Sequence, residues 1–558
     1  MTAWSPLVSA LDGLIMKPSL LFHTVRHLKS KQIYGRVAAR LRRQIVDRSP
    51  APQLRQRMGP WVAPVERPAS LLGRWHVRFL NEEGEIEQAD QWNDARKSML
   101  WRYNLHYFDD LATRSSPERA AMQRELIGRW ILENPSGMGI GWEPYPLSLR
   151  IVNWIKWCLG GQQHEPHWID SLAVQLRWLE RNVEWHLLGN HVLANAKALV
   201  FAGMFFAGEE ADRWRAQGLD IYWHELSEQI LADGGHFELS PMYHAIILED
   251  LLDLMNAARA YGQETEPVVK TLPTTISGMR KWLTAMTHPD GCPAFFNDAS
   301  FDIAPTISDL EAYATRLGLE AVAKLPEGVH VLKSSGYACI NCAEMTAILD
   351  MAPVGPDYIP GHAHADTLSF ELSLGRERIV VNSGTSTYAV GPLRTAQRST
   401  ASHSTVEIGD LSSSEVWGSF RVARRARVFD VKICDQSEPC VISASHDGYH
   451  RLAGRPTHRR SWCFSRQSLI VRDEITGQGA HPALARFYFA AGIVARAQPS
   501  GLAGLLLTQS GRSIMWTVSS PARIQKGVWY PGFGKTIQNE VLAVPIDTGA
   551  LETHFRWS

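Results

Sequence analysis

The sequence has no net charge, few cysteines and no long hydrophobic run. Lys plus Arg and Asp plus Glu each number 57 in 558 residues. No global field therefore attracts nucleic acid or an acidic membrane, and any polyanion site has to be local. The longest apolar run, ALVFAGMFFAG, is too short to span a bilayer. The N-terminal stretch lacks a basic start, a long apolar centre and a small-residue cleavage site in that order. These absences favour a soluble, cytoplasmic protein, with the periplasm as the alternative.

The seven cysteines are scattered along the chain. Cys339 and Cys342 form a C-x-x-C pair, but they lie in YACINCAEMTAILDM, whose pattern is that of a strand. No second pair stands at zinc-ribbon spacing. An odd, dispersed set in a cytoplasmic protein favours reduced thiols over disulfides or zinc ligands.

The spacing of apolar residues divides the chain into three regions. Residues 1–70 contain an expected basic helix in TVRHLKSKQIYGRVAARLRRQIV, whose charges are most simply a solvated face, and an extended Pro- and Arg-rich linker. Residues 71–325 begin with a small hairpin and continue with seven amphipathic segments at helical spacing. Residues 326–558 alternate with a period of two, which predicts many short antiparallel strands. The fold class is therefore α+β and multidomain.

Two polar clusters lie at expected helix starts. In LLGNHVLANAKAL, Asn190 and His191 follow a glycine, and an Asn at such a position is most simply a helix N-cap. In DGGHFELSPMYH, His236, Glu238 and Tyr243 crowd the entry to a helix. A phenol there can face a cleft, although an ordinary half-buried tyrosine is the simpler interpretation.

A third cluster, GHAHADTLSFEL, places His362, His364 and Asp366 within five positions. The H-x-H-x-D pattern is found in zinc hydrolases. Metallo-β-lactamases have a further His after the Asp, where Thr367 stands here, and amidohydrolases have the motif early in a β/α barrel. The two histidines lie on one side of an extended segment, so we expect both to point into the same cleft.

Basic residues form two further groups. In GPLRTAQRSTASHSTVEIGD, Arg394 and Arg398 precede a strand, in a loop that could hold a carboxylate or sulfate. In RVARRARV, a strand would place Arg421, Arg425 and Arg427 on one face. Together with residues 458–460 they could form a basic wall for an acidic polymer, although a solvated sheet face is the simpler interpretation.

The ordered set of motifs resembles the heparinase II/III-like polysaccharide lyases, which are related to certain alginate lyases. The motifs are GNH, DGGHFELSPMYH, GHAHADTLSFEL, VVNSGTSTY and RSTASHSTVEIGD, over roughly residues 100–410. The segments FHTVRHLKSKQIYGRV and WEPYPLSLRIVNW look like members from bacterial exopolysaccharide loci. The resemblance implies an incomplete (α/α) toroid followed by an antiparallel β-sandwich, which agrees with the change of period.

The resemblance also implies chemistry. These enzymes cleave uronic-acid glycosides by β-elimination, in which the sugar carboxylate is neutralised, the C5 proton is removed and the leaving oxygen is protonated. Asn190 and His191 match the neutralising positions, and Tyr243 and His362 match the acid/base pair. We expect an acidic polysaccharide or oligosaccharide substrate and no nucleic acid partner. The expected substrate-binding residues are His236, Glu238, Tyr388, Arg394 and Arg398.

The resemblance points to a structural metal in some relatives. The matching positions are His364, His403 and, on the next strand, Asn382, where an acidic ligand is usual. Because Asn brings no charge, it is a poorer ligand for Zn²⁺ or Ca²⁺. We therefore expect that no cofactor is required and that a structural divalent metal is an open alternative. Asp366 is expected to orient one of the neighbouring histidines.

Three other functions stay open on the sequence. A uronate C5-epimerase would use the same proton abstraction, followed by return of a proton to the opposite face of the sugar. A non-catalytic glycan-binding or assembly protein of an exopolysaccharide pathway would not need an acid/base pair. A metal hydrolase would need a bound metal for activity.

Overall fold

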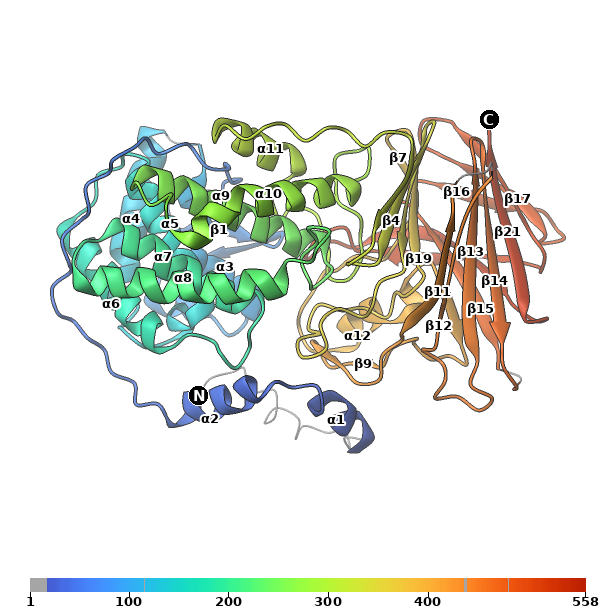
Figure 1. Cartoon of the computed structure of the whole chain (residues 1–558), viewed down its shortest axis with the longest axis horizontal. Helices are drawn as coiled ribbons and strands as arrows, with labels where there is room; N and C mark the ends of the chain where they lie inside the picture. Colours follow the sequence, from blue (N-terminus) through green and yellow to red (C-terminus); the bar gives the residue numbers. More distant parts are fainter. Residues whose placement is uncertain (1–17, 115, 436–438, 480) are drawn as a thin grey trace.

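The computed structural model describes residues 18–114, 116–435, 439–479 and 481–558. A helical lobe and a β lobe lie side by side, and the chain passes from the first to the second (Figure 1). Helix α11 ends at Arg316, and the first strand of the β lobe, β3, begins at Gly328. The lobes form an incomplete (α/α) toroid and an antiparallel β-sandwich, so the predicted fold class is confirmed.

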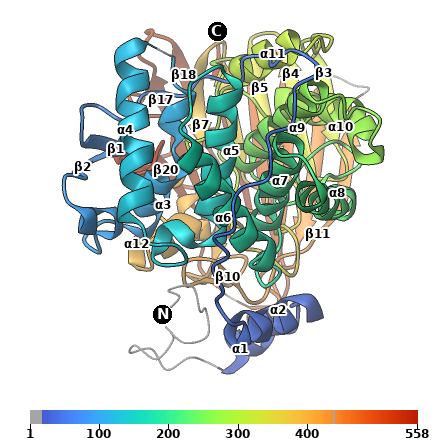
Figure 2. The same ribbon diagram turned by 90° about the vertical axis from the view of Figure 1, so that its left-hand side faces the viewer.

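Helices α4 to α10 correspond to the seven amphipathic segments predicted from the sequence. Their neighbours, α3 and α11, were not predicted, because short helices carry too few turns to show a periodic pattern. Helix α7 packs against α5, α8 and α9 (Figure 2), and His191 is its one residue that is not buried. The helices are α3 (Met99–Tyr107), α4 (Pro117–Glu133), α5 (Pro144–Leu159), α6 (Pro166–Arg181), α7 (Asn190–Phe205), α8 (Glu209–Gln229), α9 (Pro241–Ala260), α10 (Pro267–Ala285) and α11 (Ile307–Arg316).

From Pro18 on, the described part of the N-terminal region contains two helices instead of the single basic helix that was predicted. They are α1 (Pro18–Val25) and α2 (Ser30–Leu41), and they lie below the two lobes in Figure 1. The chain then runs extended along the helical lobe, where Leu54 pairs with Phe206. It enters the predicted hairpin, formed by β1 (His76–Phe79) and β2 (Glu82–Glu85). None of the described helices has the length and apolar character needed to cross a membrane.

The β lobe is a sandwich of two antiparallel sheets. The first has the order β19-β20-β15-β7-β6-β5-β4-β3, with β8 also paired to β15, and the second has the order β11-β12-β13-β14-β21-β18-β17-β16. Phe370, Trp462, Phe487, Trp516 and Phe555 fill the space between them. The strands of the first sheet are β3 (Gly328–Leu332), β4 (Tyr337–Cys342), β5 (Met345–Asp350), β6 (Phe370–Leu374), β7 (Glu377–Val381), β8 (Val406–Ile408), β15 (Ala483–Phe489), β19 (Arg523–Trp529) and β20 (Ile537–Pro545). Those of the second are β11 (Val428–Cys434), β12 (Cys440–His446), β13 (Thr457–Ser465), β14 (Ser468–Thr476), β16 (Val494–Ala497), β17 (Ala503–Leu507), β18 (Ser513–Val518) and β21 (Ala550–Trp557).

The strand predicted at residues 421–427 is wrong, and the basic wall that it could have supported does not form. Residues 421–427 are not one strand: β10 ends at Val422 after pairing with β9 (Val416–Trp417), and β11 begins at Val428. Arg460 faces the interior, where it binds the carboxylate of Asp473 together with His458. These buried polar groups point into the sandwich because β13 alternates between its two faces.

A small apolar cluster joins the two lobes. Leu239 and Trp282 of the helical lobe pack against Tyr337 and Ile348 of the first sheet. The Tyr337 hydroxyl also donates to the carbonyl oxygen of Leu239 at 2.9 Å. This junction fixes the start of α9 relative to the loop that leads into β6, and the predicted site residues lie on these two segments.

Candidate functional site

The buried carboxylate of Asp298 is the centre of the site. Asp298 lies in the loop between α10 and α11, and its two oxygens accept from His362 Nδ1 and His364 Nε2, each at 2.9 Å. Arg394 forms a two-pronged ion pair with the same carboxylate, with Nη2 2.7 Å from Oδ2. Burial alone would raise the pKa of Asp298, but Arg394 and the two histidines hold that pKa well below its usual value. Asp298 thus stays charged and fixes groups from both lobes.

The imidazole of His362 is the part of this network that reaches the surface. Its side chain is 14% exposed, whereas that of His364 is fully buried. The expectation that both histidines point into one cleft is wrong for His364: both rings turn to Asp298, and only His362 reaches the surface. Because Asp298 accepts from Nδ1, the neutral ring of His362 carries its proton there and leaves Nε2 as the basic nitrogen.

Tyr243 stacks on His362 across the junction. The two ring centroids lie 3.9 Å apart at an interplanar angle of 31°. Tyr243 is placed in the first turn of α9, where Ser240 caps the helix by accepting from its backbone N–H. Its hydroxyl lies 3.1 Å from the hydroxyl of Tyr388. Burial and this second phenol raise the pKa of Tyr243 well above its usual value, so the hydroxyl remains a proton donor near neutral pH.

The start of α7 brings Asn190 and His191 to the same junction. Gly189, at φ 59°, precedes them, and an added Cβ there would lie 2.8 Å from Ile359 Cδ1 of the β lobe. The Ile359 side chain could move aside, but the backbone of Gly189 at φ 59° and ψ −143° is a conformation that favours glycine over residues with a side chain. The simple N-cap interpretation of Asn190 is wrong: the helix begins at Asn190, Gly189 is the cap, and no side chain caps the helix. The Asn190 amide is thus available for other partners.

His191 is oriented by a carboxylate of its own. Its Nδ1 lies 3.2 Å from Glu184 Oε2, and its ring lies 4.5 Å from that of Tyr145. Burial lowers the pKa of His191, but Glu184 outweighs it and raises the pKa above its usual value. Glu184 was not predicted, because it lies in the loop before α7 with no recognisable motif.

Glu238 lies between the two groups of site residues. Its Oε1 accepts from the backbone N–H of Asn190 at 3.4 Å, and its Oε2 lies 3.6 Å from His362 Nε2. Burial raises the pKa of Glu238, and Oε2 has no hydrogen-bond partner among the described residues. A protonated Glu238 would be a donor that faces the junction. The neighbouring His236 is fully buried, with Nε2 3.0 Å from Gln229 Oε1.

The two arginines predicted to bind substrate lie behind the site. Arg394, on α12 (Pro392–Arg398), is fully buried on Asp298, and Arg398 donates to the carbonyl oxygens of Ala363 and Ser419. Both guanidinium groups have hydrogen-bond partners within the protein. The prediction that they contact substrate directly is therefore wrong, and their role is to position other residues of the site. Tyr388 is half-buried and lies beside Tyr243, where a ligand contact stays a prediction.

The three predicted metal ligands offer a weak donor set. His364 Nδ1 faces His403 Nε2 at 3.3 Å, and both rings are fully buried. The Asn382 amide is committed, because its oxygen accepts from Ser404 N–H and its nitrogen donates to Ser369. Among the residues that the structure describes, no three His, Cys, Asp or Glu side chains are arranged to hold a metal ion. The set of two imidazoles and a neutral amide fits a divalent metal poorly.

The predicted role of Asp366 is wrong. Its Oδ2 accepts from the backbone N–H of Asn297 at 3.0 Å and does not hydrogen-bond to a histidine. Asn297 has a left-handed backbone (φ 57°), and its side-chain oxygen accepts from the backbone N–H of His364. Asp366 therefore shapes the loop that presents Asp298, the residue that performs the predicted orienting role.

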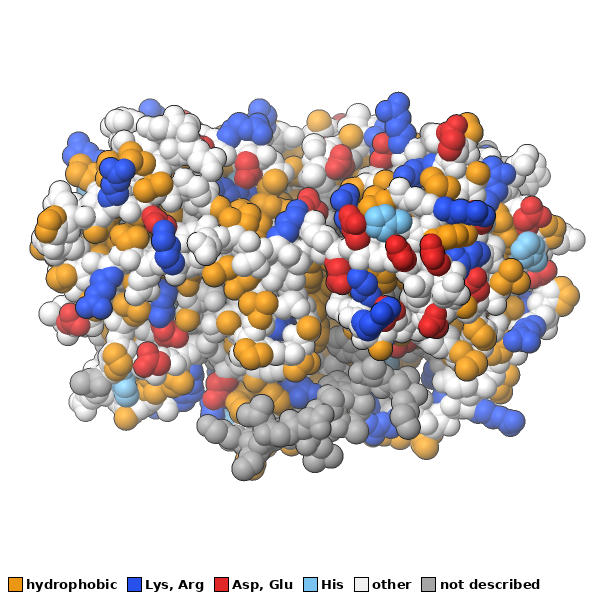
Figure 3. Space-filling view, turned by 180° about the vertical axis from the view of Figure 1, so that it is seen from behind, with side chains coloured by type: hydrophobic (Ala, Val, Ile, Leu, Met, Phe, Trp, Pro, Cys, Tyr) orange, Lys and Arg blue, Asp and Glu red, His pale blue; other side chains and the backbone are white. Residues whose placement is uncertain are grey.

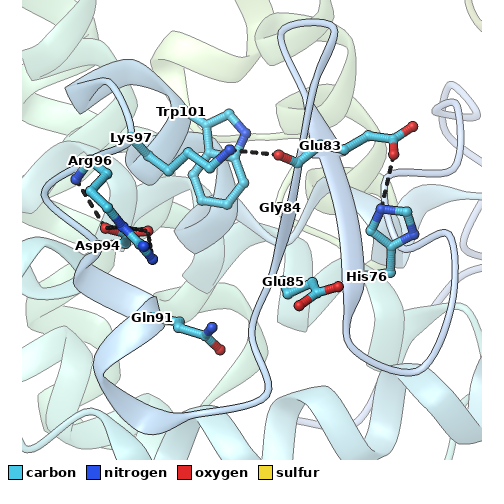
Figure 4. A pocket seen from close by; sticks show the side chains of 9 residues that line it. All are labelled: His76, Glu83, Gly84, Glu85, Gln91, Asp94, Arg96, Lys97 and Trp101. Atoms are coloured by element: carbon cyan, nitrogen blue, oxygen red, sulfur yellow. Dashed lines mark hydrogen bonds and ion pairs between the residues drawn. The ribbon is translucent and has the colours of Figure 1, made fainter.

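A surface hollow lies away from this junction. It has a volume of about 330 Å³ and lies between the hairpin and the segment that leads into α3 (Figure 4). Its charged side chains pair with each other: Arg96 binds Asp94, and Lys97 donates to the carbonyl oxygen of Glu83. On the face in Figure 3, positive and negative side chains are likewise interspersed over both lobes. Neither feature offers an acidic polymer a surface of a single sign.

Two family models match most of the chain. The model described as Heparinase II/III N-terminus matches residues 166–315, and the model described as Heparinase II/III-like, C-terminal matches residues 324–558. A heparin-sulfate lyase of Bacteroides stercoris is 30% identical over 311 residues, which cover 52% of this chain and 44% of the relative. The chain thus spans less than half the length of this relative. FtsZ-localized protein C of Caulobacter vibrioides is 24% identical over 411 residues, covering 71% of this chain and 68% of that protein.

Solved structures agree on the architecture. The crystal structure of heparinase III superposes with a TM-score of 0.67 at 16% identity, covering 98% of this chain and 87% of that one. The heparinase III structure of the BT4657 gene product gives a TM-score of 0.63 at 18% identity, with 84% and 80% covered. At these identities the likeness establishes the shared fold.

Proposed function

The chain belongs to the heparinase II/III-like family, and from this premise we propose that it is a lyase that cleaves a uronic-acid-containing glycan by β-elimination. The observation that carries the proposal is the stack of Tyr243 on His362, with Asp298 fixing the imidazole from behind. A proton donor and a proton acceptor are thus held together at the junction of the two lobes. A role in exopolysaccharide metabolism is part of the proposal and rests on the resemblance of the N-terminal segments.

Neutralisation of the sugar carboxylate is assigned to the start of α7. The C5 proton of a uronate is weakly acidic because the adjacent carboxylate is already negative. Donors aimed at that carboxylate stabilise the dianion that forms in the transition state. The free amide of Asn190 and the imidazolium of His191, which Glu184 favours, supply such donors. Burial raises the pKa of Glu238, which in its protonated form would add a third donor without adding negative charge.

The elimination step is assigned to the stacked pair. His362 Nε2 accepts the C5 proton while Asp298 stabilises the imidazolium that forms. The C4–O bond breaks, the electron pair of the C5–H bond becomes the C4=C5 double bond, and the Tyr243 hydroxyl protonates the leaving oxygen. The raised pKa of Tyr243 supports its role as the acid, and the hydrogen bond at His362 Nδ1 supports Nε2 as the base. No step needs a metal.

A non-catalytic function is the second candidate. It is favoured by the long match to FtsZ-localized protein C, whose name refers to a location and not to a reaction. A binding protein would have no use for a base with a buried orienting carboxylate. The two functions therefore differ in whether Tyr243 and His362 matter for turnover or only for binding.

The test is an ultraviolet assay for the unsaturated uronate on heparosan, heparan sulfate, hyaluronan, chondroitin and alginate. A rise in absorbance that is lost in Tyr243→Phe and in His362→Ala supports the lyase and identifies its substrate class. Entry of solvent deuterium at C5 without a rise would indicate the epimerase. Glycan binding with neither signal, and with binding unchanged in Tyr243→Phe, would favour the binding protein and overturn the proposal.

A further inference from the structure

The N-terminal helix pair has no part in the proposed reaction, and the second of its helices turns apolar side chains towards solvent. We call residues Pro18–Leu41, which form α1 and α2, the strap. The strap runs below both lobes (Figure 1) and contacts each of them. The indole N–H of Trp417, in the β lobe, donates to Thr24 Oγ1 at 3.1 Å, and Lys29 forms an ion pair with Glu228 of α8.

One face of α2 is held firmly against the protein. Gln32 is buried, and its side-chain nitrogen donates to the carbonyl oxygen of Tyr358 at 3.2 Å. An added Cβ at Gly35 would lie 2.9 Å from the backbone nitrogen of His186, so α2 approaches the helical lobe closely at this point. These contacts fix which side of the helix points outward.

The outward side of α2 is apolar. Ile33, Tyr34, Val37 and Leu41 are exposed by 49%, 74%, 52% and 80%. With about 100° of rotation per residue, they occupy one arc of about 100° opposite Gln32. A surface helix normally turns its apolar stripe towards the core. Here the stripe points away from the protein, and in α1 Phe22 is also 64% exposed.

The charge of the strap and the segment after it has a single sign. Residues 18–46 contain no Asp or Glu in a chain whose total charge is zero. Their cations are Arg26, Lys29, Lys31, Arg36, Arg40, Arg42 and Arg43. Lys29 and Lys31 cover the aromatic rings of Tyr358 and Trp185 on the protein side. Arg26, before the start of α2, and Arg43, after its end, are exposed, so positive charge lies beyond both ends of the helix that carries the apolar arc.

We propose that the strap docks the protein on an anionic lipid surface, with the apolar arc of α2 inserted at the level of the headgroups. An apolar face flanked by Lys and Arg is the arrangement by which amphipathic helices lie in the membrane interface. Each basic residue near an anionic leaflet adds to the attraction. A purely electrostatic partner such as a soluble acidic glycan would use the cations but would leave the apolar arc in water.

The test is co-sedimentation of the full-length protein with vesicles. One set is made of phosphatidylcholine mixed with phosphatidylglycerol, and the other of phosphatidylcholine alone. We expect binding to the first set, weakened by salt, and little binding to the second. Tyr34→Glu and Leu41→Glu should each lower the partition coefficient about tenfold or more. Leu132→Glu is the matched control, because Leu132 is 83% exposed on α4, outside the strap, and should bind like wild type.

Two results would overturn the proposal. One is vesicle binding that Tyr34→Glu and Leu41→Glu leave unchanged. The other is an absence of vesicle binding combined with a change of oligomeric state in light scattering. If the wild-type protein is a dimer and Leu41→Glu is a monomer, the arc is a contact between two copies. Neither result depends on turnover, so the proposal can fail while the lyase function stands, and the reverse.

Discussion

Glu184→Gln should change the pH dependence of the reaction without removing any group that touches the substrate. In the wild-type protein the carboxylate lies 3.2 Å from His191 Nδ1, and the pKa of His191 is raised despite burial. The Glu184 side chain is only 6% exposed and that of His191 is 26% exposed, so solvent screens the pair incompletely. An opposite charge at such a distance raises the pKa of an imidazole. In the variant only the more weakly acting carboxylates of Glu238 and Glu143 still oppose the effect of burial, and we expect the pKa of His191 to fall.

The sign of the effect follows from the proposed role. The imidazolium of His191 assists neutralisation below its pKa, and this help is lost as the pH rises through the pKa. A lower pKa decreases the charged fraction of His191 at any pH above the pKa of the variant. The alkaline limb of kcat/KM, measured by ultraviolet absorbance, should therefore move to lower pH in Glu184→Gln. The two enzymes should converge at a pH below both values. Glu125→Gln, which breaks an exposed ion pair with Arg74, is the control. Parallel profiles for Glu184→Gln and wild type would refute the reasoning.

Three further predictions concern groups behind the site and in the sandwich. Asp298→Asn leaves Arg394 buried without its counter-charge and should lower the free energy of unfolding, measured by urea titration, by about 3–5 kcal/mol. The double variant Asp298→Asn/Arg394→Met should recover part of this stability. Tyr388→Phe removes the hydroxyl partner of Tyr243 and should lower the free energy of unfolding by about 1 kcal/mol. An unchanged midpoint of thermal unfolding would argue against that hydrogen bond. Although burial alone would raise the pKa of Asp473, Arg460 and His458 lower it to about 2. The stability it provides should be complete above its unfolded pKa of about 4 and be lost as the pH falls towards about 2, as urea midpoints over that range would show.

The architecture was accessible from the sequence because the period of the apolar residues changes once, near the start of β3. The meeting of Tyr243 and His362 was also accessible, but only through the resemblance, since no local pattern relates a helix start to a loop that follows it by more than a hundred residues. Asp298 was missed because a single Asp in the loop FFNDAS has no distinguishing spacing. Its function depends on three partners that only the tertiary fold brings to it. The strand predicted at residues 421–427 is wrong although the sequence pattern there alternates. Only Arg421 and Val422, which form β10, pair with another strand, because pairing depends on tertiary contacts that the alternation does not reveal.

The order in which the chain is synthesised gives the Asp298 network a further significance. Asp298 is made with the helical lobe, whereas His362, His364 and Arg394 follow tens of residues later. A ribosome adds about 5–20 residues per second, so a nascent helical lobe carries this carboxylate for several seconds before its counter-charge exists. The carboxylate would be solvated or protonated during that interval, and it becomes a fixed anion only when the second lobe docks. The ion pair therefore marks the docking of the second lobe, and an isolated helical lobe, however well folded, would lack half of the site.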